Sequence, residues 1–126
     1  MTPEPTEQEM LVAACSRLGW KQVGLNGHVF CGMNPKDLDA ATQLENVEWD
    51  ICPDLLHSLD AHFAPGSTVE HMRNKGWEIQ VYSGTGGEKE PFGCLFIKPE
   101  ELAARIYGYA PTPAMAILKA FLKHES

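Results

Sequence analysis

The chain has 126 residues, of which 44% are hydrophobic and 21% are charged, and its formal net charge is −7. These values predict a single folded domain over residues 1–126 with an ordinary hydrophobic core, and they exclude a disordered chain. The negative charge, without any cluster of lysine and arginine, argues against direct binding to nucleic acid. No apolar run reaches the roughly 20 residues that a bilayer-spanning helix needs, so no association with a membrane is expected.

The N-terminal segment and the cysteines both favour the cytoplasm. Residues 1–6 contain two prolines and predict a flexible arm, and the segment lacks the basic start and apolar centre of a secretory signal. The four cysteines include no C-x-x-C pair and are sparser than those of disulfide-rich small domains, so reduced thiols are expected.

The first predicted helix begins after Thr6 and ends near Leu18. Thr6 can accept a hydrogen bond at the helix N-terminus, and Glu9 occupies the capping-box position three residues later. Gly19 is a typical residue for a helix to end on. One apolar stripe runs along this helix, made by Met10, Leu11, Ala14 and Leu18.

A β-hairpin is predicted after the first helix. Asn26-Gly27 lies between two short apolar runs, and the favoured two-residue turn requires positive φ at both central positions, which Asn and Gly tolerate. The pattern predicts strands near 20–25 and 28–32. Farther along, Asn34-Pro35 can begin a short helix that runs through Leu44, and residues 47–51 favour a short extended stretch.

Two helices are predicted in the middle of the chain. The first begins at Pro53 and ends before Pro65-Gly66. Its apolar stripe consists of Leu55, Leu56, Leu59 and Phe63. The second begins at Ser67, which forms another capping-box pattern with Glu70, and it continues through Lys75.

A second hairpin is predicted next. Residues 77–82 alternate between apolar and polar, which indicates a half-buried strand with three side chains on one face, Trp77, Ile79 and Val81. Residues 92–97 are apolar at every position that carries a side chain, which predicts the central strand of the sheet. Residues 99–104 form either a helical turn or a loop into a further strand over 105–109.

The last predicted helix is capped by Thr112, with Pro113 at its first position. Its buried stripe consists of Ala114, Ile117, Leu118, Phe121 and Leu122. The order of elements predicts an α+β fold, a layered sandwich of a small, mainly antiparallel sheet flanked by helices.

Residues 107–122 contain a Pro-Thr-Pro turn and a helix in which Ala116, Ile117 and Ala120 stand at characteristic positions, with Lys119 in place of an arginine. This stretch resembles the C-terminal signature of the phage ABA sandwich domain family, which comprises small phage and prophage proteins. The resemblance implies helices on both sides of a small sheet and an origin in a bacteriophage or prophage, and therefore the cytoplasm of a bacterial host. It implies no activity and gives no residue a role.

The sequence contains no complete catalytic or cofactor-binding motif. Residues 84–89 are rich in glycine but match neither phosphate-binding pattern, so they are interpreted as a hairpin loop. The candidate nucleophiles lie outside any G-x-S-x-G turn, namely Ser67, Thr85 and Cys94. The carboxylates near His57 are interpreted as surface charge on an amphipathic helix, namely Asp50, Asp54 and Asp60. No enzyme and no cofactor is predicted.

The histidines and cysteines do not have the spacing of metal ligands. His28 and Cys31 are three residues apart in a predicted strand and so face opposite ways, and His57 and His62 are five apart in a predicted helix. Cys52 and Asp54 flank that helix without forming a second pair. No metal site is predicted, the cysteines are expected to be buried as small apolar residues, and the histidines are expected on solvent-exposed faces.

Three aromatic residues are candidates for a protein-binding surface. Trp49 lies in a stretch that alternates poorly, and Tyr82 and Tyr109 lie on or near strand ends, where exposed aromatic side chains often mark interfaces. The strand over residues 77–82 has a polar outer face and is a candidate edge strand, so a homodimer through this strand is a further prediction.

The hypothesis that these observations favour is a non-catalytic phage or prophage accessory protein that binds a host or phage protein. In one variant, clustered acidic residues imitate DNA. The alternative is a small-molecule-binding protein or enzyme with a pocket between sheet and helices, which a space filled by Trp77, Ile79, Val81, Phe96 and Phe121 would exclude. A minor virion component is the third hypothesis.

Overall fold

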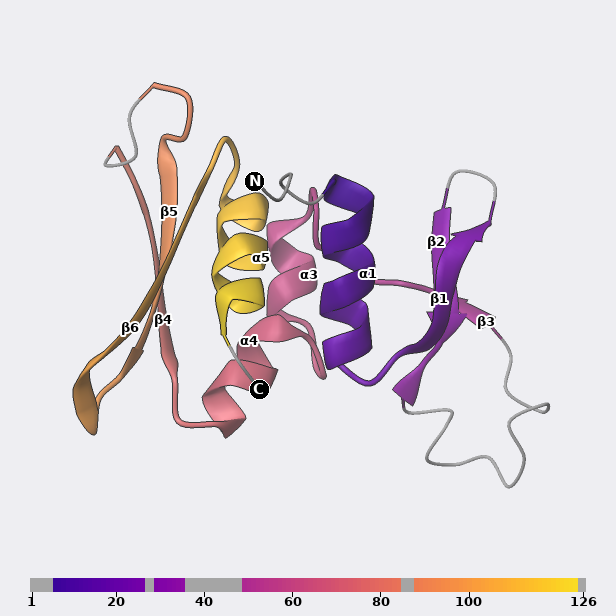
Figure 1. Cartoon of the computed structure of the whole chain (residues 1–126), viewed down its shortest axis with the longest axis horizontal. Helices are drawn as coiled ribbons and strands as arrows, with labels where there is room; N and C mark the ends of the chain where they lie inside the picture. Colours follow the sequence, from indigo (N-terminus) through magenta and orange to yellow (C-terminus); the bar gives the residue numbers. More distant parts are fainter. Residues whose placement is uncertain (1–5, 27–28, 36–48, 85–87, 125–126) are drawn as a thin grey trace, which may run out of the picture.

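The computed structural model describes residues 6–26, 29–35, 49–84 and 88–124. Over these residues the chain forms four helices and six strands (Figure 1). The helices are α1 (Glu7–Arg17), α3 (Leu59–Phe63), α4 (Thr68–Asn74) and α5 (Pro113–Lys123). The strands are β1 (Lys21–Asn26), β2 (Val29–Met33), β3 (Trp49–Ile51), β4 (Glu78–Ser83), β5 (Phe92–Lys98) and β6 (Glu101–Ala110). None of the helices among these residues is long and apolar enough to cross a membrane.

The helices lie between two antiparallel sheets (Figure 1). One sheet has the order β1-β2-β3 and the other the order β4-β5-β6. The helix α5 packs on the second sheet, and α1 lies next to the first. The predicted α+β fold, with antiparallel strands and helices packed on sheets, is confirmed. The strands divide into two sheets because β3 pairs with β2 whereas β4 pairs with β5, and the helices occupy the space between the sheets instead of both sides of one sheet.

The first helix forms as predicted, and the predicted hairpin forms one residue later along the chain, because Asn26, expected in its turn, is the last residue of β1. Thr6 Oγ1 accepts a hydrogen bond from the backbone N–H of Glu9 at 3.1 Å, and the chain leaves the helix at Gly19 with a φ of +97°. β1 and β2 are antiparallel neighbours, with Asn26 paired to Val29 across the turn. Gly27, the other predicted turn residue, and the helix predicted through Leu44 lie outside the described residues, apart from Asn34 and Pro35.

The helix that was predicted from Pro53 is shorter than expected. The chain first makes a turn in which the Asp54 carboxylate accepts a hydrogen bond from the backbone N–H of His57 at 3.3 Å. Ser58 Oγ then accepts one from the N–H of Ala61 at 3.3 Å and caps α3. Asp54 and Ser58 can each accept a hydrogen bond at the start of a helix with this apolar pattern. In the structure Ser58 is the cap, so the helix begins at Leu59.

The later start changes which side chains are buried. Leu55 and Leu56 are buried as predicted, whereas Leu59 and Phe63 expose 39% and 48% of their surface. His62 takes the buried position instead and is fully enclosed. The apolar stripe predicted for this helix is therefore correct only in its first half.

Ser67 stands at the N-cap of α4, as predicted, but the capping box is incomplete. Glu70 Oε2 accepts a hydrogen bond from the backbone N–H of Gly66 at 3.2 Å, one residue before the cap. Ser67 Oγ accepts no hydrogen bond from the first turn of the helix. The α4 helix ends before Gly76, which has a φ of +92°.

The β4–β5–β6 sheet forms as predicted, with β5 in the centre. Of the two alternatives for residues 99–104, the further strand is correct and the helical turn is wrong, and the strand begins earlier than expected, at Glu101. The link before it is a turn of residues 99–100. The inner face of this sheet is closed by α5, and Gly108 is where strand and helix approach most closely. A Cβ built on Gly108 would meet the carbonyl oxygen of Ala116 and lie 2.6 Å from the backbone nitrogen of Ala120.

The last helix also agrees with its prediction. Thr112 Oγ1 accepts a hydrogen bond from the N–H of Met115 at 3.3 Å, and Pro113 is the first helical residue. The side chains of its stripe enter the core, where Ile117, Leu118 and Phe121 are almost fully buried. At its other end Arg17 of α1 donates hydrogen bonds to three backbone carbonyl oxygens, those of Phe121, Leu122 and His124, at 3.2, 3.0 and 2.8 Å.

Candidate functional site

Tyrosines of β4 and β6 meet on the outer face of their sheet. Tyr82 and Tyr109 both pair with Gly93 of the central strand, so their side chains point to the same face. A Cβ built on Gly93 would lie 2.5 Å from the ring of Tyr82, which shows that this ring lies across the glycine. The neighbouring residues Cys94 and Phe96 point inward and are buried, so the tyrosines point away from the helices.

The tyrosines contact one another as well as the sheet. The hydroxyl of Tyr82 donates a hydrogen bond to that of Tyr109 at 3.4 Å, and the two rings meet edge to face with centroids 6.4 Å apart. The ring of Tyr107 lies parallel to that of Tyr109, also at 6.4 Å. Leu95 pairs with Tyr107 in the next row. These four residues, Tyr82, Leu95, Tyr107 and Tyr109, form what we call the tyrosine face, and no described element covers it (Figure 1).

The structure brings together two of the three residues predicted as a protein-binding surface. Tyr82 and Tyr109 are in contact, and Tyr107 joins them. Trp49 lies in β3, which belongs to the other sheet, on the far side of the helical layer (Figure 1). Sequence spacing did not reveal the cluster because it depends on the register of β4 and β6 against one glycine.

The two edges of the β4–β5–β6 sheet are protected differently. At the β6 edge, Lys123 Nζ donates a hydrogen bond to the carbonyl oxygen of Tyr107 at 2.7 Å, and the pairing with β5 is irregular between Ile97 and Lys98. The β4 strand pairs with β5 over all six of its residues and contains neither lysine nor proline. Val81 exposes 38% of its surface there. Lysines, prolines and bulges usually protect an edge strand from pairing with another chain. The β4 strand contains none of them, so we call it an open edge.

The residues considered for acid–base catalysis do not assemble. His57 Nδ1 lies 3.1 Å from Oδ1 of Asp54, and both side chains are largely exposed. Asp60, the other candidate on the predicted helix, lies within α3, whereas His57 precedes that helix. Asp50 belongs to β3. His57 and Asp54 are thus an exposed surface pair in the turn before α3, and the expectation that His57 lies on the same helix as Asp60 is wrong.

The remaining candidates are the nucleophiles and the metal ligands. Burial raises the pKa of Cys94 to about 12, so its thiol is protonated at neutral pH. Thr85 and His28 lie outside the described residues. Within the described ranges, no group of three or more His, Cys, Asp or Glu side chains could hold a metal ion.

His62 contradicts the expectation that the histidines lie on solvent-exposed faces. Its Nε2 lies 2.8 Å from the carbonyl oxygen of Leu55, and its Nδ1 lies 2.7 Å from Oγ1 of Thr68. A carbonyl oxygen can only accept, so Nε2 carries the proton and donates, and Nδ1 of the neutral ring accepts from the threonine hydroxyl. Burial lowers the pKa of His62, and the hydrogen bond to Leu55 opposes that shift. The ring thus joins the turn before α3 to the start of α4.

The cysteines are free and buried, in agreement with the prediction. Cys15 of α1 and Cys52, which follows β3, are hydrogen-bonded neighbours although they are far apart in sequence. Burial is the main cause of the raised pKa of both thiols. They therefore act as small apolar groups that join α1 to the β1–β2–β3 sheet.

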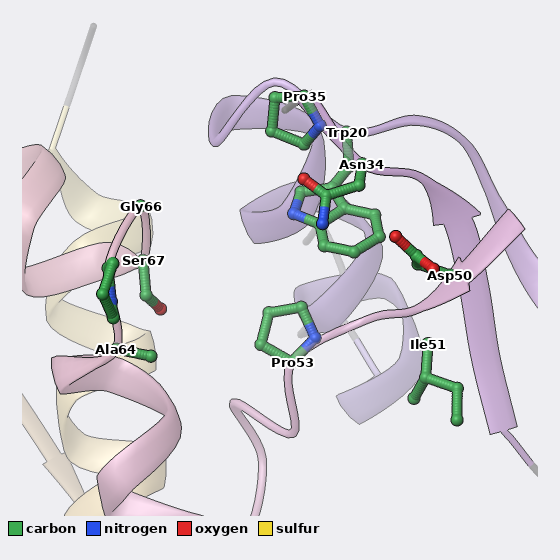
Figure 2. A pocket seen from close by; sticks show the side chains of 10 residues that line it. Trp20, Asn34, Pro35, Asp50, Ile51, Pro53, Ala64, Gly66 and Ser67 are labelled. Atoms are coloured by element: carbon green, nitrogen blue, oxygen red, sulfur yellow. The ribbon is translucent and has the colours of Figure 1, made fainter. Parts of the chain in front are cut away.

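A pocket of about 650 Å³ opens between the β1–β2–β3 side of the molecule and the turn that joins α3 to α4 (Figure 2). One wall carries Trp20, Asn34, Pro35 and Asp50, and the opposite wall carries Ala64, Pro65, Gly66 and Ser67. Pro53 lies between the two walls, and the Asp50 carboxylate is turned towards Trp20 (Figure 2). We call this space the Ser67 pocket.

The prediction of a pocket between sheet and helices has a different outcome at each sheet. At the β4–β5–β6 sheet, three of the five side chains expected to fill the space are buried, namely Trp77, Phe96 and Phe121. Ile79 is partly buried, and Val81 is exposed. At the β1–β2–β3 sheet the Ser67 pocket remains open.

A second hollow of about 490 Å³ lies where β6 meets α5, with Tyr109 at its wall. Its charged groups already have partners within the chain. Lys119 Nζ lies 3.3 Å from Oε2 of Glu90, and Lys123 is bonded to the carbonyl oxygen of Tyr107. This hollow therefore offers a ligand less unused polar chemistry than the Ser67 pocket.

The chain was compared with protein-family models, with curated proteins and with solved structures, and none of them matches it. The resemblance of residues 107–122 to the phage ABA sandwich domain family therefore stays a prediction. The geometry of the tyrosine face and of the β4 edge therefore carries the functional proposal.

Proposed function

We propose that this chain is a non-catalytic protein-binding module that takes up an extended segment of a partner protein along β4. The observation that carries the proposal is the open β4 edge, which lies beside the tyrosine face. Addition of a strand to an exposed sheet edge supplies main-chain hydrogen bonds, and side-chain contacts on the sheet supply specificity. The partner, following the sequence resemblance, is a host or phage protein in the cytoplasm of a bacterial host.

The side chains near β4 suit such a partner. Val81 is a large apolar residue that is partly exposed, and Tyr82 offers an aromatic ring with a hydroxyl group. Tyrosine is enriched at protein interfaces because it combines apolar area with hydrogen bonding. An apolar or aromatic residue of the added strand can pack against Tyr82, while its backbone pairs with β4.

The proposal favours a protein over nucleic acid for electrostatic reasons. The chain has a net charge of −7, and the charged residue of β4 is Glu78. Phosphate groups would be repelled by this charge, whereas the neutral backbone of a peptide would not.

The test compares two lysine substitutions at exposed positions on opposite edge strands of the same sheet. We expect Val81→Lys to abolish or greatly weaken retention of the partner from a bacterial lysate, because a charged lysine on an edge strand disfavours pairing with another strand. Ala103→Lys in β6 is the matched control and should leave retention unchanged, since Ala103 is exposed on the edge that is already guarded. The captured protein is then purified, and its affinity for each variant is measured.

Tyr82→Ala provides the second arm of this test. It should weaken the binary complex at least about tenfold, as truncation of a central interface tyrosine commonly does. Equal affinity of the native chain, Val81→Lys and Tyr82→Ala would contradict the proposal. Light scattering addresses the predicted homodimer: a dimer that Val81→Lys dissociates would show that a second copy, and not another protein, occupies β4.

A further inference from the structure

We propose that the Ser67 pocket binds a small organic cation, an amine, quaternary ammonium or guanidinium compound that also carries a hydrogen-bonding group. This site lies between the β1–β2–β3 side of the molecule and the turn before α4, whereas the tyrosine face belongs to the other sheet, and the inference does not depend on the proposed protein-binding function.

Ser67 is the first observation that points to a ligand. It exposes only 4% of its surface, and its Oγ is a buried polar atom without a hydrogen-bond partner among the described residues. Figure 2 shows this side chain on the pocket wall with its oxygen turned towards Pro53. A buried polar group without a partner is costly, and a serine hydroxyl can turn about its Cα–Cβ bond to donate to or accept from a bound group.

The charged and aromatic groups of the pocket determine the class of ligand. Asp50 contributes a carboxylate and Trp20 an indole ring, and Figure 2 shows the carboxylate turned towards the ring. An organic cation is attracted both by a carboxylate and by the face of a tryptophan ring. Among the described residues that line the pocket there is no lysine, arginine or histidine to compete for Asp50 or to attract an anion.

The remaining wall disfavours an anionic ligand. Pro35, Pro53 and Pro65 have no backbone N–H to donate, and the N–H of Gly66 is already bonded to the carboxylate of Glu70 at 3.2 Å. An anion entering here would approach the carboxylate of Asp50 and find few free donors. A cation would instead meet the carboxylate of Asp50, the ring of Trp20 and the apolar rings of the prolines.

The size of the pocket fits a small molecule. Its volume of about 650 Å³ is within the range of roughly 300–1,000 Å³ that is usual for ligand pockets. A compound with an ammonium or guanidinium head on a short apolar body can place the head between Asp50 and Trp20 and a hydroxyl or amide towards Ser67.

The experiment uses choline and its uncharged isostere 3,3-dimethylbutan-1-ol, which have the same shape and the same hydroxyl. Each is titrated into the full chain labelled with ¹⁵N at constant ionic strength, and the chemical shift of the Trp20 indole N–H is followed. Its signal is assigned by its loss in Trp20→Phe. We expect saturable binding, with a Kd for choline at least about tenfold below that of the isostere.

Two variants separate the contribution of the Asp50 charge to the Kd from that of the Ser67 hydroxyl. Asp50→Asn should raise the Kd of choline to that of the isostere and leave the isostere unaffected. Ser67→Ala should weaken both compounds by the same factor of about three to five, the loss of one neutral hydrogen bond. Asp60→Asn, which makes the same change of charge at an exposed position outside the pocket, should affect neither.

Three results would overturn the proposal. The first is the absence of any saturable shift, and the second is equal binding of choline and its isostere by the native chain. The third is binding of methyl β-glucoside as tight as that of choline, which would assign the pocket to neutral sugars. Thermal unfolding of each variant shows whether it is folded, and the comparison of two ligands on one variant does not depend on its stability.

Discussion

The two sheets meet the helices in different ways. The inner face of the β4–β5–β6 sheet is sealed, since Cys94 and Phe96 are almost fully buried and α5 lies directly on Gly108. The strands of the β1–β2–β3 sheet have 6, 5 and 3 residues, and the pairing of β1 with β2 is irregular between Lys21 and Gly24. Gln22, within this irregularity, has a φ of +55°.

The difference explains where each proposed site lies. A sheet that is sealed against a helix can bind a partner only through its outer face and its edges, which is where the tyrosine face and the β4 edge are found. A sheet that meets the helices incompletely leaves space at the boundary, and the Ser67 pocket lies there, between β3 and the turn before α4. One layered fold thus offers a place for each of the two proposed binding surfaces.

The largest expected effect comes from breaking the sealed interface. Gly108→Ala places a Cβ against the backbone of Ala116 and Ala120, and a helix backbone cannot yield as a side chain does. We expect it to lower the free energy of unfolding by about 3 kcal/mol, at the upper end of the range for overpacked cores. Denaturant unfolding measures this value.

The matched control for Gly108→Ala lies in the other sheet. A Cβ on Gly24 in β1 would have no heavy atom within 4 Å. Gly24→Ala should therefore change the free energy of unfolding by no more than about 0.5 kcal/mol. Equal effects of the two substitutions would show that the sheets do not differ in their packing.

The next largest effect is a dependence of stability on pH, which we assign to His62 in α3. Burial lowers the pKa of His62 below its ordinary value of 6.5. Below about pH 6.5 the unfolded chain therefore takes up a proton that the folded chain does not, so the stability contributed by neutral His62 is complete above this pH and is lost as the pH falls. Unfolding midpoints measured between pH 8 and 5 should decline.

His62→Gln separates this contribution from that of other groups. The pKa values of His71 and His124 are also lowered by burial, so the native chain alone cannot identify the source of the decline. We expect His62→Gln to be less stable than the native chain by about 1–3 kcal/mol at pH 8, because the hydrogen bonds to Leu55 and Thr68 are impaired. The difference should shrink towards pH 5, and a constant difference would contradict the assignment.

The sequence predicts correctly those helices and strands whose caps and apolar patterns lie within the element itself. Thr6 and Thr112 are side-chain caps that act within their own helix, and the apolar run of β5 matches its place in the centre of the sheet. The alternation of residues 77–82 predicts the β4 strand correctly but not its burial, since Val81, expected on the buried face, is exposed. The start of α3 was predicted wrongly because two sequential caps, Asp54 and Ser58, fit one apolar pattern, and only packing decides between them.

The candidate sites depended on long-range geometry. The tyrosine face requires the exact pairing of two strands with Gly93, and no local spacing encodes that register. The Ser67 pocket joins residues from position 20 to position 67, brought together by the packing of one sheet against the turn before α4. Ser67 looked from the sequence like an ordinary helix cap, and only its unpaired hydroxyl in the structure distinguishes it.

The smallest expected effect compares the two faces of the sealed sheet. Gly93→Ala places a Cβ about as close to a neighbour as Gly108→Ala does, at 2.5 Å from the ring of Tyr82. That neighbour is the far end of a side chain on the solvent side, so the ring can swing away. We expect a loss of about 1 kcal/mol, from displacement of the ring and of its hydrogen bond to Tyr109.

Aromatic NMR signals provide the specific measurement for Gly93→Ala. Nuclear Overhauser contacts between the rings of Tyr82 and Tyr109 should disappear, whereas those of the core ring Phe96 should persist. If Gly93→Ala cost as much stability as Gly108→Ala, the outer face would be packed as firmly as the inner one. The ring of Tyr82 would then be held in place as firmly as a core side chain.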